Sequence, residues 1–268
     1  MGIITISRGS YSKGKEIAEK LAQNLGYQCV SRDILIEASE SFNVPEIKLI
    51  RALHDSPSVL ERFTYGKERY ISYIRKALLE HVAKDNVIYH GLAGHFFLKG
   101  VPHVLKVRII ANMEDRVKEE MKREKISEKE ARYILKKDDE ERRKWGLYLY
   151  GIDTSDASLY DVVLHIDNLG VDDAVEILAG MAKRPCFQTT PESKKILSDL
   201  LLAARAHAAL VNEFPTAEVT SRDGVVYVNV KGTMIRDSSA SEKVVKLLNR
   251  VEGIKEVKAN VVPVITPD

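Results

Sequence analysis

The chain has 268 residues, 44% hydrophobic and 30% charged, which is typical of a soluble protein with one large or two ordinary domains. A formal net charge of only +2 gives no strong field for nucleic acid or an anionic membrane, so we expect no nucleic-acid partner. The two cysteines are far apart, no signal peptide pattern begins the chain, and no apolar run approaches the roughly 20 residues of a spanning helix, so we expect a cytoplasmic protein.

The first 25 residues predict a strand, a loop and a helix. Residues 3–6 are apolar and β-branched, which favours a short buried strand, and residues 17–25 keep one apolar helical face. Between them, residues 9–15 fit the pattern Gly-x4-Gly-Lys of a phosphate-binding loop. In that interpretation the loop amides and the helix N-terminus face a phosphate, and Lys15 supplies a point charge.

The match to this loop is incomplete. Glu16 stands where the standard loop has a Ser or Thr that binds Mg²⁺. A glutamate oxygen could bind magnesium, but it adds negative charge beside the phosphates. An ordinary strand–turn–helix with a lysine in its turn is the alternative interpretation.

The next part of the chain alternates short apolar strands with helical patterns. Strands are predicted at 27–30, 87–89, 104–111 and 161–166, and helical patterns at 34–41, 45–84 (interrupted near 55–57), 114–144 and 171–181. With the first strand, this predicts an α/β fold with a doubly wound, parallel, five-stranded sheet. Ligands of such sheets bind beyond the carboxyl ends of the strands, which brings residues 8–15, 31–33 and 90–95 to one cleft.

A change of pattern near residue 183 predicts a domain boundary. Residues 183–191 hold two prolines and no periodicity, so they predict a linker between a domain at 1–182 and one at 192–268. The second domain has predicted elements in the order α-β-β-α-β, at 193–212, 217–220, 225–230, 239–251 and 257–265. This order predicts a small α+β domain.

The charged stretch 114–145 has nearly equal numbers of acids and bases, and most of it reads as a solvated helical face. One subset differs, because spacings of three and four place Arg132, Lys136, Asp139 and Arg143 on one face with Arg142 beside it. A cationic face that closes over a phosphate site would neutralise charge during phosphoryl transfer.

The first domain resembles the cytidylate-kinase-like proteins, P-loop relatives of the nucleoside monophosphate kinases, over about residues 1–182. The resemblance rests on a series of short motifs taken in order: Ile-Thr-Ile-Ser-Arg at 4–8, Ser12, Gly14 and a basic residue before Glu-Ile-Ala, Ser-Arg-Asp at 31–33, Val-Ile-Tyr-His-Gly at 87–91, Ile-Ser-Glu-Lys-Glu-Ala at 126–131 followed by the basic helix 136–142, and Tyr-Asp-Val-Val-Leu at 160–164.

This resemblance implies phosphoryl transfer from ATP, with Mg²⁺, to a nucleoside monophosphate or similar acceptor under a helical lid. It implies three groups of site residues: a phosphate loop of Arg8, Gly9, Ser10, Ser12, Lys13, Gly14, Lys15 and Glu16; an acceptor site with Arg32, Asp33 and Gly91; and Lys15, Arg132, Asp139, Arg142 and Arg143 as catalytic residues.

The sequence departs from the family pattern at several positions. Tyr11 and Lys13 replace two glycines of the loop, and Leu92 replaces an arginine after the third strand. A regulatory protein that binds nucleotide without turnover is therefore an alternative, and a scaffold without phosphate binding is a third. His90 and His95 lie near the cleft, where we expect structural histidines, and we predict no protein metal site.

The second domain resembles a BON domain over about residues 192–266. The motifs are Asp-Gly-Val-Val at 223–226, Val-Lys-Gly-Thr at 230–233, and Val-Glu-Gly-Ile-Lys-Glu-Val at 251–257 followed by Asn-Val-Val at 260–262. The resemblance implies a module that binds a phospholipid or a small ligand. It assigns no chemistry to a single residue, and the sequence does not give the oligomeric state.

Overall fold

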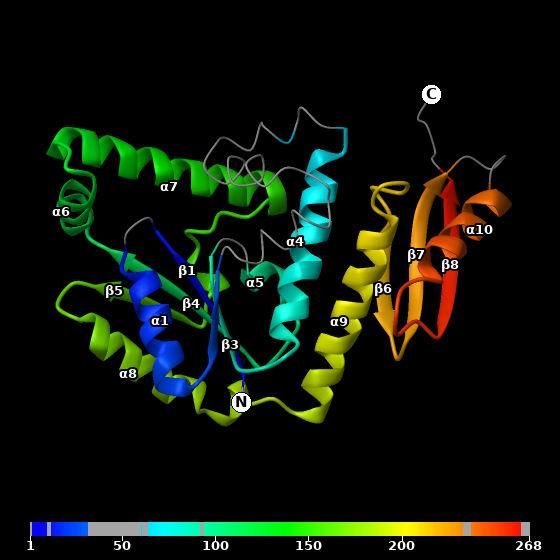
Figure 1. Cartoon of the computed structure of the whole chain (residues 1–268), viewed down its shortest axis with the longest axis horizontal. Helices are drawn as coiled ribbons and strands as arrows, with labels where there is room; N and C mark the ends of the chain where they lie inside the picture. The colour runs from blue at the N-terminus through cyan, green and yellow to red at the C-terminus, as the bar shows by residue number, and fades with distance from the viewer. Residues whose placement is uncertain are drawn as a thin grey trace.

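The computed structural model of the chain describes residues 2–9, 12–31, 60, 64–91, 94–232 and 237–263. Figure 1 shows a first sheet covered by helices, and a second, smaller sheet on the far side of helix α9. The helix predicted at 34–41 and most of the helical pattern predicted at 45–63 lie outside the described residues. Ser10, Tyr11, Arg32, Asp33 and Leu92 lie outside them as well.

The first sheet has five parallel strands, which confirms the predicted α/β architecture. Its strands are β1 (Ile3–Arg8), β2 (Gln28–Val30), β3 (Val87–His90), β4 (Val104–Ala111) and β5 (Val162–Ile166), in the order β2-β3-β1-β4-β5. In the parallel register Ser7 lies opposite Arg108, and Ile6 opposite His90. The carboxyl ends of β1, β3 and β4 therefore meet at one edge of the sheet.

Helices cover both faces of this sheet, as a doubly wound fold requires. Helices α1 (Gly14–Leu25) and α8 (Val171–Ala182) pack on the face that holds Ile4 and Ile6. Helices α4 (Gly66–Val82) and α5 (Gly94–Phe97) lie on the other face, where Ile3 is buried. Each fully buried isoleucine of β1 stabilises the fold by about 1.5–3 kcal/mol.

The charged stretch forms two helices rather than one. Helix α6 (Met113–Glu124) ends at Lys125, which has the left-handed φ of 55°, and α7 (Glu128–Tyr150) begins after it. Ser127 and Glu130 form a capping box that fixes the start of α7. At the other end of α7, Trp145 is 1% exposed and its ring centroid lies 5.7 Å from that of Tyr70 on α4. This contact holds α7 on the body of the domain.

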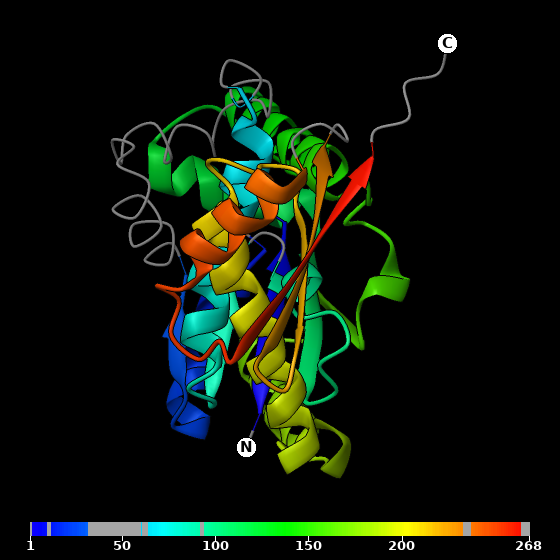
Figure 2. The same ribbon diagram turned by 90° about the vertical axis from the view of Figure 1, so that its right-hand side faces the viewer.

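Two short 3₁₀ segments, Ala157–Leu159 and Pro185–Phe187, precede β5 and α9. The C-terminal part has the predicted order α-β-β-α-β, with α9 (Pro191–Leu210), β6 (Glu218–Arg222), β7 (Val225–Gly232), α10 (Asp237–Leu248) and β8 (Glu256–Pro263). β6 and β7 are antiparallel, whereas β7 and β8 are parallel. Figure 2 views this part of the molecule from the side of the second sheet. The BON family itself stays a prediction.

Helix α9 packs on two cores at once. One face, with Leu197, Ala204 and Ala208, joins the core around α4, and the other, with Ala206 and Leu210, joins the core of the second sheet. Figures 1 and 2 show α9 between α4 and β6. The helix predicted to open a separate domain is thus also part of the first core. Among the described residues, no helix combines the length and hydropathy needed to cross a membrane.

Candidate functional site

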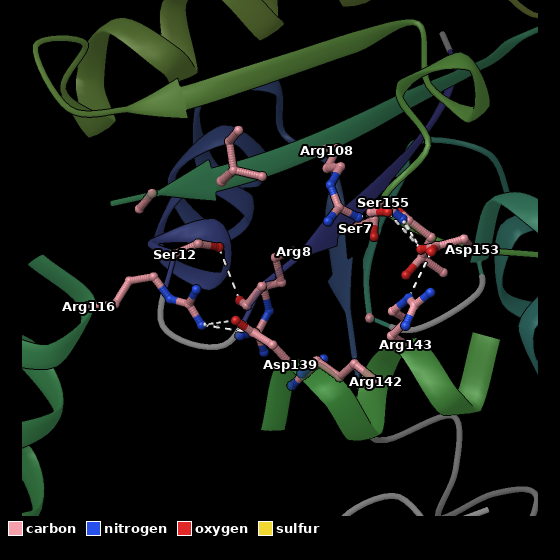
Figure 3. Close-up of a pocket in the computed structure, with 15 residues that line it drawn as sticks. Ser7, Arg8, Ser12, Arg108, Arg116, Asp139, Arg142, Arg143, Asp153 and Ser155 are labelled. Carbon is pink, nitrogen blue, oxygen red and sulfur yellow. Dashed lines mark hydrogen bonds and ion pairs between the residues drawn. The ribbon is translucent and has the colours of Figure 1, made fainter. Parts of the chain in front are cut away.

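A pocket of about 230 Å³ lies between the carboxyl edge of the first sheet and helix α7 (Figure 3). Its walls come from the ends of β1, β3 and β4, the loop before α1, helices α6 and α7, and the segment after α7. The residues that line it are Ser7, Arg8, Gly9, Ser12, Gly91, Arg108, Ile110, Ala111, Arg116, Asp139, Arg142, Arg143, Asp153, Thr154 and Ser155.

The lining is strongly cationic. It includes five arginines and two aspartates, so positive charges exceed negative ones by three. Guanidinium groups match the geometry of phosphate and carboxylate oxygens and bind them through paired hydrogen bonds. The pocket is therefore suited to an anion that carries several charges.

One end of the pocket is built on the loop between β1 and α1. Ser12 is 1% exposed, and its hydroxyl oxygen lies 3.1 Å from the carbonyl oxygens of both Gly9 and Ile109, which ties the loop to β4. Above the loop, Arg116 of α6 forms an ion pair with Asp139 of α7, at 2.8 and 2.9 Å from its two carboxylate oxygens. A Cβ added to Gly9 would lie 3.6 Å from Asp139, so the ion pair sits directly over this glycine.

The other end is built on the segment that follows α7. The Arg143 Nε donates to Asp153 at 2.8 Å, and the Ser155 amide and hydroxyl donate to the same carboxylate at 2.9 and 2.7 Å. These hydrogen bonds, that of Arg143 first, lower the pKa of Asp153 far below its usual range, so the carboxylate is ionised. Arg108 donates to the carbonyl of Thr154.

A buried polar layer lies under this end. The Tyr160 hydroxyl lies 3.1 Å from the Ser7 hydroxyl and 2.9 Å from the Thr154 carbonyl. The ring of His95 stands 4.9 Å from that of Tyr160, and burial, together with Lys106 and Arg108, lowers the pKa of His95 to about 4. His95 is therefore neutral near pH 7.

The pocket brings together seven of the residues singled out from the sequence: Arg8, Gly9, Ser12, Gly91, Asp139, Arg142 and Arg143. Five others lie outside its lining: Lys13, Gly14, Lys15, Glu16 and Arg132. Ser10, Arg32 and Asp33 fall outside the described residues.

The cations outside the lining are held by nearby acids. The Lys15 side chain is 64% exposed and its Nζ lies 3.6 Å from Glu19, one turn further along α1. Arg132 contacts Glu114 at 3.3 Å and Glu128 at 3.0 Å. Arg132 precedes Asp139 by seven residues, which is about 10 Å along the helix axis, so a shared helical face does not bring both to one pocket.

A family comparison agrees with this architecture. The model of the Cytidylate kinase-like family matches residues 3–168, which run from β1 to the segment after β5. The chain belongs to the cytidylate kinase-like family. The match ends before α9, so the C-terminal part lies outside it.

Curated relatives within this family are named cytidylate kinase. That of Methanosarcina acetivorans is 38% identical over 100 residues, 37% of this chain and 54% of the relative. That of Thermococcus kodakarensis is 31% identical and matched over 53% of its length, so the chain spans about half the length of these two relatives. The cytidylate kinase of Sulfolobus acidocaldarius is 25% identical over 182 residues, 68% of this chain and 94% of the relative.

A solved structure of an uncharacterized protein from Eubacterium ventriosum is similar in fold. It superposes with a TM-score of 0.53 at 20% identity, over 69% of this chain and the full length of that chain. At this identity the likeness concerns the fold alone.

Several lining residues of this cytidylate kinase-like chain were missed from the sequence: Ser7, Arg108, Ile110, Ala111, Arg116, Asp153, Thr154 and Ser155. Arg108 could have been recognised in the sequence, because burying a charged residue near the end of an otherwise apolar strand costs free energy unless the side chain faces a polar site. Arg116 could not have been, since its partner Asp139 is 23 residues away on another helix. Asp153 follows α7 in a turn, where its carboxylate accepts a hydrogen bond from the amide two positions on, as aspartates in ordinary turns do.

The excess positive charge fits the phosphates of ATP. Mg²⁺ at phosphate sites keeps several waters and needs only one or two carboxylates. Asp139 and Asp153 line the pocket, but each holds an arginine. Among the described residues, no group of three or more acidic, histidine or cysteine side chains could hold a metal ion, and none is assigned to Mg²⁺.

Proposed function

We propose that this protein transfers a phosphoryl group from ATP to a nucleoside monophosphate, cytidylate or a similar small acceptor. The observation that carries the proposal is the convergence of five arginines on one pocket at the carboxyl edge of the sheet. The names of the curated relatives support the same reaction class.

Phosphoryl transfer needs positioning and charge stabilisation rather than a covalent protein nucleophile. The acceptor oxygen attacks the γ-phosphorus as the bond to the β-phosphate oxygen breaks, and negative charge is spread over the oxygens between them. Arg142 and Arg143 would contact the transferred group from the side of the pocket that α7 forms. Asp139 would act through Arg116, because its ion pair holds that guanidinium over the loop at Gly9.

Two further roles remain proposals from the sequence. Gly91 follows β3 at the pocket, where it would allow the acceptor phosphate to approach the backbone. Arg32 and Asp33 would help to bind the acceptor. When bound, Mg²⁺ would neutralise part of the phosphate charge.

A second candidate function is nucleotide binding without turnover. The observation in its favour is that the lysines of the loop and of the first turn of α1 pair with acids outside the pocket: Lys13 with Glu119 at 3.3 Å and Lys15 with Glu19 at 3.6 Å. A regulatory protein would keep the arginine pocket for affinity while lacking a complete phosphate loop.

For the C-terminal part we propose a BON-like module that senses a lipid or a small ligand. The support is the motif series with its order α-β-β-α-β. Flotation of the full chain with phosphatidylcholine vesicles, with and without an anionic phospholipid, tests the lipid half of this proposal. Equal recovery with both vesicle types and with buffer alone would contradict it.

The kinase proposal is tested by ADP formation from ATP and Mg²⁺ in a coupled assay. The acceptors are CMP, dCMP, UMP, AMP and none, and the variant is Arg142→Ala. We expect the rate of ADP formation to depend on the acceptor and to fall strongly in the variant. The acceptor that gives the highest rate identifies the substrate.

The control is Arg222→Ala, which removes an 83% exposed arginine from β6. It should match the wild type with every acceptor. ADP formation that is absent from the whole panel, while ADP itself still binds, would instead support the non-catalytic candidate. Absence of both binding and turnover would contradict the two candidates together.

A further inference from the structure

Lys15 and Arg8 are the two candidates for the cation that contacts the donor phosphates at the start of α1. In the Gly-x4-Gly-Lys pattern, Lys15 is the cation that contacts the phosphates. Its side chain is 64% exposed and lies beside Glu19 on the outer surface of α1. It therefore does not contribute to the pocket that the five arginines line.

The start of α1 explains this orientation. Gly14, not Lys15, is the first residue of the helix, and Lys13 before it has the left-handed φ of 65°. Since successive helical residues are rotated by about 100°, the side chain at position 15 points away from the direction taken at position 14. The helical position that faces the end of β1 is thus occupied by a residue without a side chain.

Arg8 fills the space that this glycine leaves open. A Cβ added to Gly14 would lie 2.8 Å from both the Cβ and the Cδ of Arg8, closer than such atoms approach in proteins. Gly14 is not among the glycines with positive φ, so the backbone would accept a side chain and the obstacle is Arg8 itself. The end of β1 and the start of α1 are therefore complementary: an arginine at one and a glycine at the other.

The Arg8 side chain lines the pocket. Gly9 and Ser12 line it as well, and Figure 3 shows Arg8 between Ser12 and the side chains of α7. Its charge, with that of Arg142, acts on the buried hydroxyl of Tyr89, opposing the effect of burial on the Tyr89 pKa. That hydroxyl lies beneath Gly91, where an added Cβ would be 2.5 Å away. The positive charge of Arg8 is thus felt at the end of β3.

We propose that Arg8 is the cation that binds the donor phosphates in front of α1, in place of Lys15, and that Gly14 is required because Arg8 occupies its side-chain space. This inference rests on the proposed function of the pocket. It changes which residue carries the charge: the cation comes from the strand before the loop and not from the helix after it.

The test is the dissociation constant of ADP for the full chain, measured by calorimetry with Mg²⁺ present. We expect Arg8→Ala to weaken binding on the order of tenfold to hundredfold, the effect of a hydrogen bond to a charged group. Lys15→Ala should change it less than about threefold, as for an exposed ion pair. Gly14→Ala should weaken binding several-fold, because the added methyl displaces Arg8.

A charge-relocation variant makes the test sharper. Arg8→Gly removes both the guanidinium and the Cβ that a side chain at position 14 would meet. Adding Gly14→Lys to it places a lysine at the first position of the helix. The double variant should bind ADP more tightly than Arg8→Gly alone, on the order of tenfold.

The possible outcomes distinguish a failure of the Arg8 inference from a failure of the proposed function of the pocket. Loss of binding in Lys15→Ala with normal binding in Arg8→Ala would overturn the inference and leave the phosphate site in place. Failure of the wild type to bind ADP would instead remove the proposed function. Thermal unfolding without nucleotide identifies a variant that does not fold. If Arg8→Ala does not fold, the same test is made with Arg8→Lys and Gly14→Ala. We expect both variants to bind ADP more weakly than the wild type.

Discussion

Two sets of cations flank the same loop, and they differ in where their charge is directed. Arg8, Arg142 and Arg143 come from the end of β1 and from α7, and they line the pocket. Lys13 and Lys15 come from the start of α1, and their ammonium groups lie beside acids outside the lining. The first set lines the pocket at the sheet edge, whereas the second lies on the exposed surface at the start of α1.

This difference shows what a loop motif determines. The Gly-x4-Gly-Lys spacing fixes a turn of the chain between strand and helix, but not the direction of the lysine, which depends on where the first helical turn begins. The strand ends, in contrast, are fixed by the register of five parallel strands. Cations on strand ends are therefore placed more reliably than cations in the turn.

The largest expected effect comes from α7, where one helix carries an arginine inside the pocket and one outside. We expect Arg142→Ala to lower kcat/KM roughly 100- to 1000-fold, as for loss of a group that stabilises transition-state charge. Arg132→Ala, ten residues earlier and paired with Glu128, should change it less than about threefold. The measurement is the initial rate of ADP formation at several acceptor concentrations.

Lys129→Ala is the control on the same helix, because Lys129 is exposed and outside the lining. Equal losses in Arg132→Ala and Arg142→Ala would show that the whole helical face acts on the phosphates, as the sequence spacing alone suggested. The contrast between pocket and surface cations would then not hold for α7.

How much of the fold and of the site could be predicted from the sequence has physical causes. The sheet could be predicted because buried parallel strands require apolar, β-branched runs such as 104–111, which coincides with β4. The residues at the strand ends, such as Arg8 and Gly91, could be placed near one another because parallel carboxyl ends share an edge. The split of α6 from α7 was missed, although Ser127 and Glu130 have the spacing of a capping box.

The remaining site residues depend on tertiary contacts that no local pattern encodes. Arg116 is in the pocket because α6 folds back on α7 and pairs it with Asp139. Asp153 is there because the chain returns beneath α7 to meet Arg143. In both cases the ion pair joins segments whose separation in the sequence varies freely with helix and loop length.

A second expected effect concerns the buried His95, which lies beneath the pocket. The pKa of His95 is about 4 in the folded protein against about 6.5 unfolded, through burial and then Lys106 and Arg108. Between these values the unfolded chain binds the extra proton, so the free energy of unfolding falls as pH decreases from about 6.5 to 4. His95→Gln should reduce this loss by up to about 3 kcal/mol.

The measurement is urea unfolding at several pH values. His207 also has its pKa lowered to about 4, so only the difference between wild type and variant reports His95. Because an anion near Arg108 would oppose the positive field, ADP should raise the His95 pKa in NMR titrations. A value unchanged by saturating ADP would indicate that the ligand charge does not reach this end of the pocket.

A third effect compares an ion pair of the pocket with one on the surface of the same helix. Arg116 has a side chain only 9% exposed, and Asp139→Asn removes the carboxylate charge that pairs with it, at a cost of about 2 kcal/mol in stability. Glu128→Gln, which breaks the exposed pair with Arg132, should cost less than about 0.5 kcal/mol. Chemical denaturation without nucleotide measures both, and equal costs would contradict the distinction.

The smallest effect tests whether the turn itself matters. Lys13 precedes α1 in the left-handed region at φ 65°, which a β-branched residue adopts with difficulty. Lys13→Val should therefore lower stability by about 1 kcal/mol, whereas Lys13→Gly should be near neutral, because the relieved strain is offset by the greater entropy of the unfolded chain. Urea unfolding measures these changes. If the pocket arginines carry the phosphate charge, Lys13→Gly should also leave ADP affinity within about threefold, since the ion pairs that it removes, with Glu16 and Glu119, are exposed. A much larger loss of affinity would mean that Lys13 itself binds the ligand.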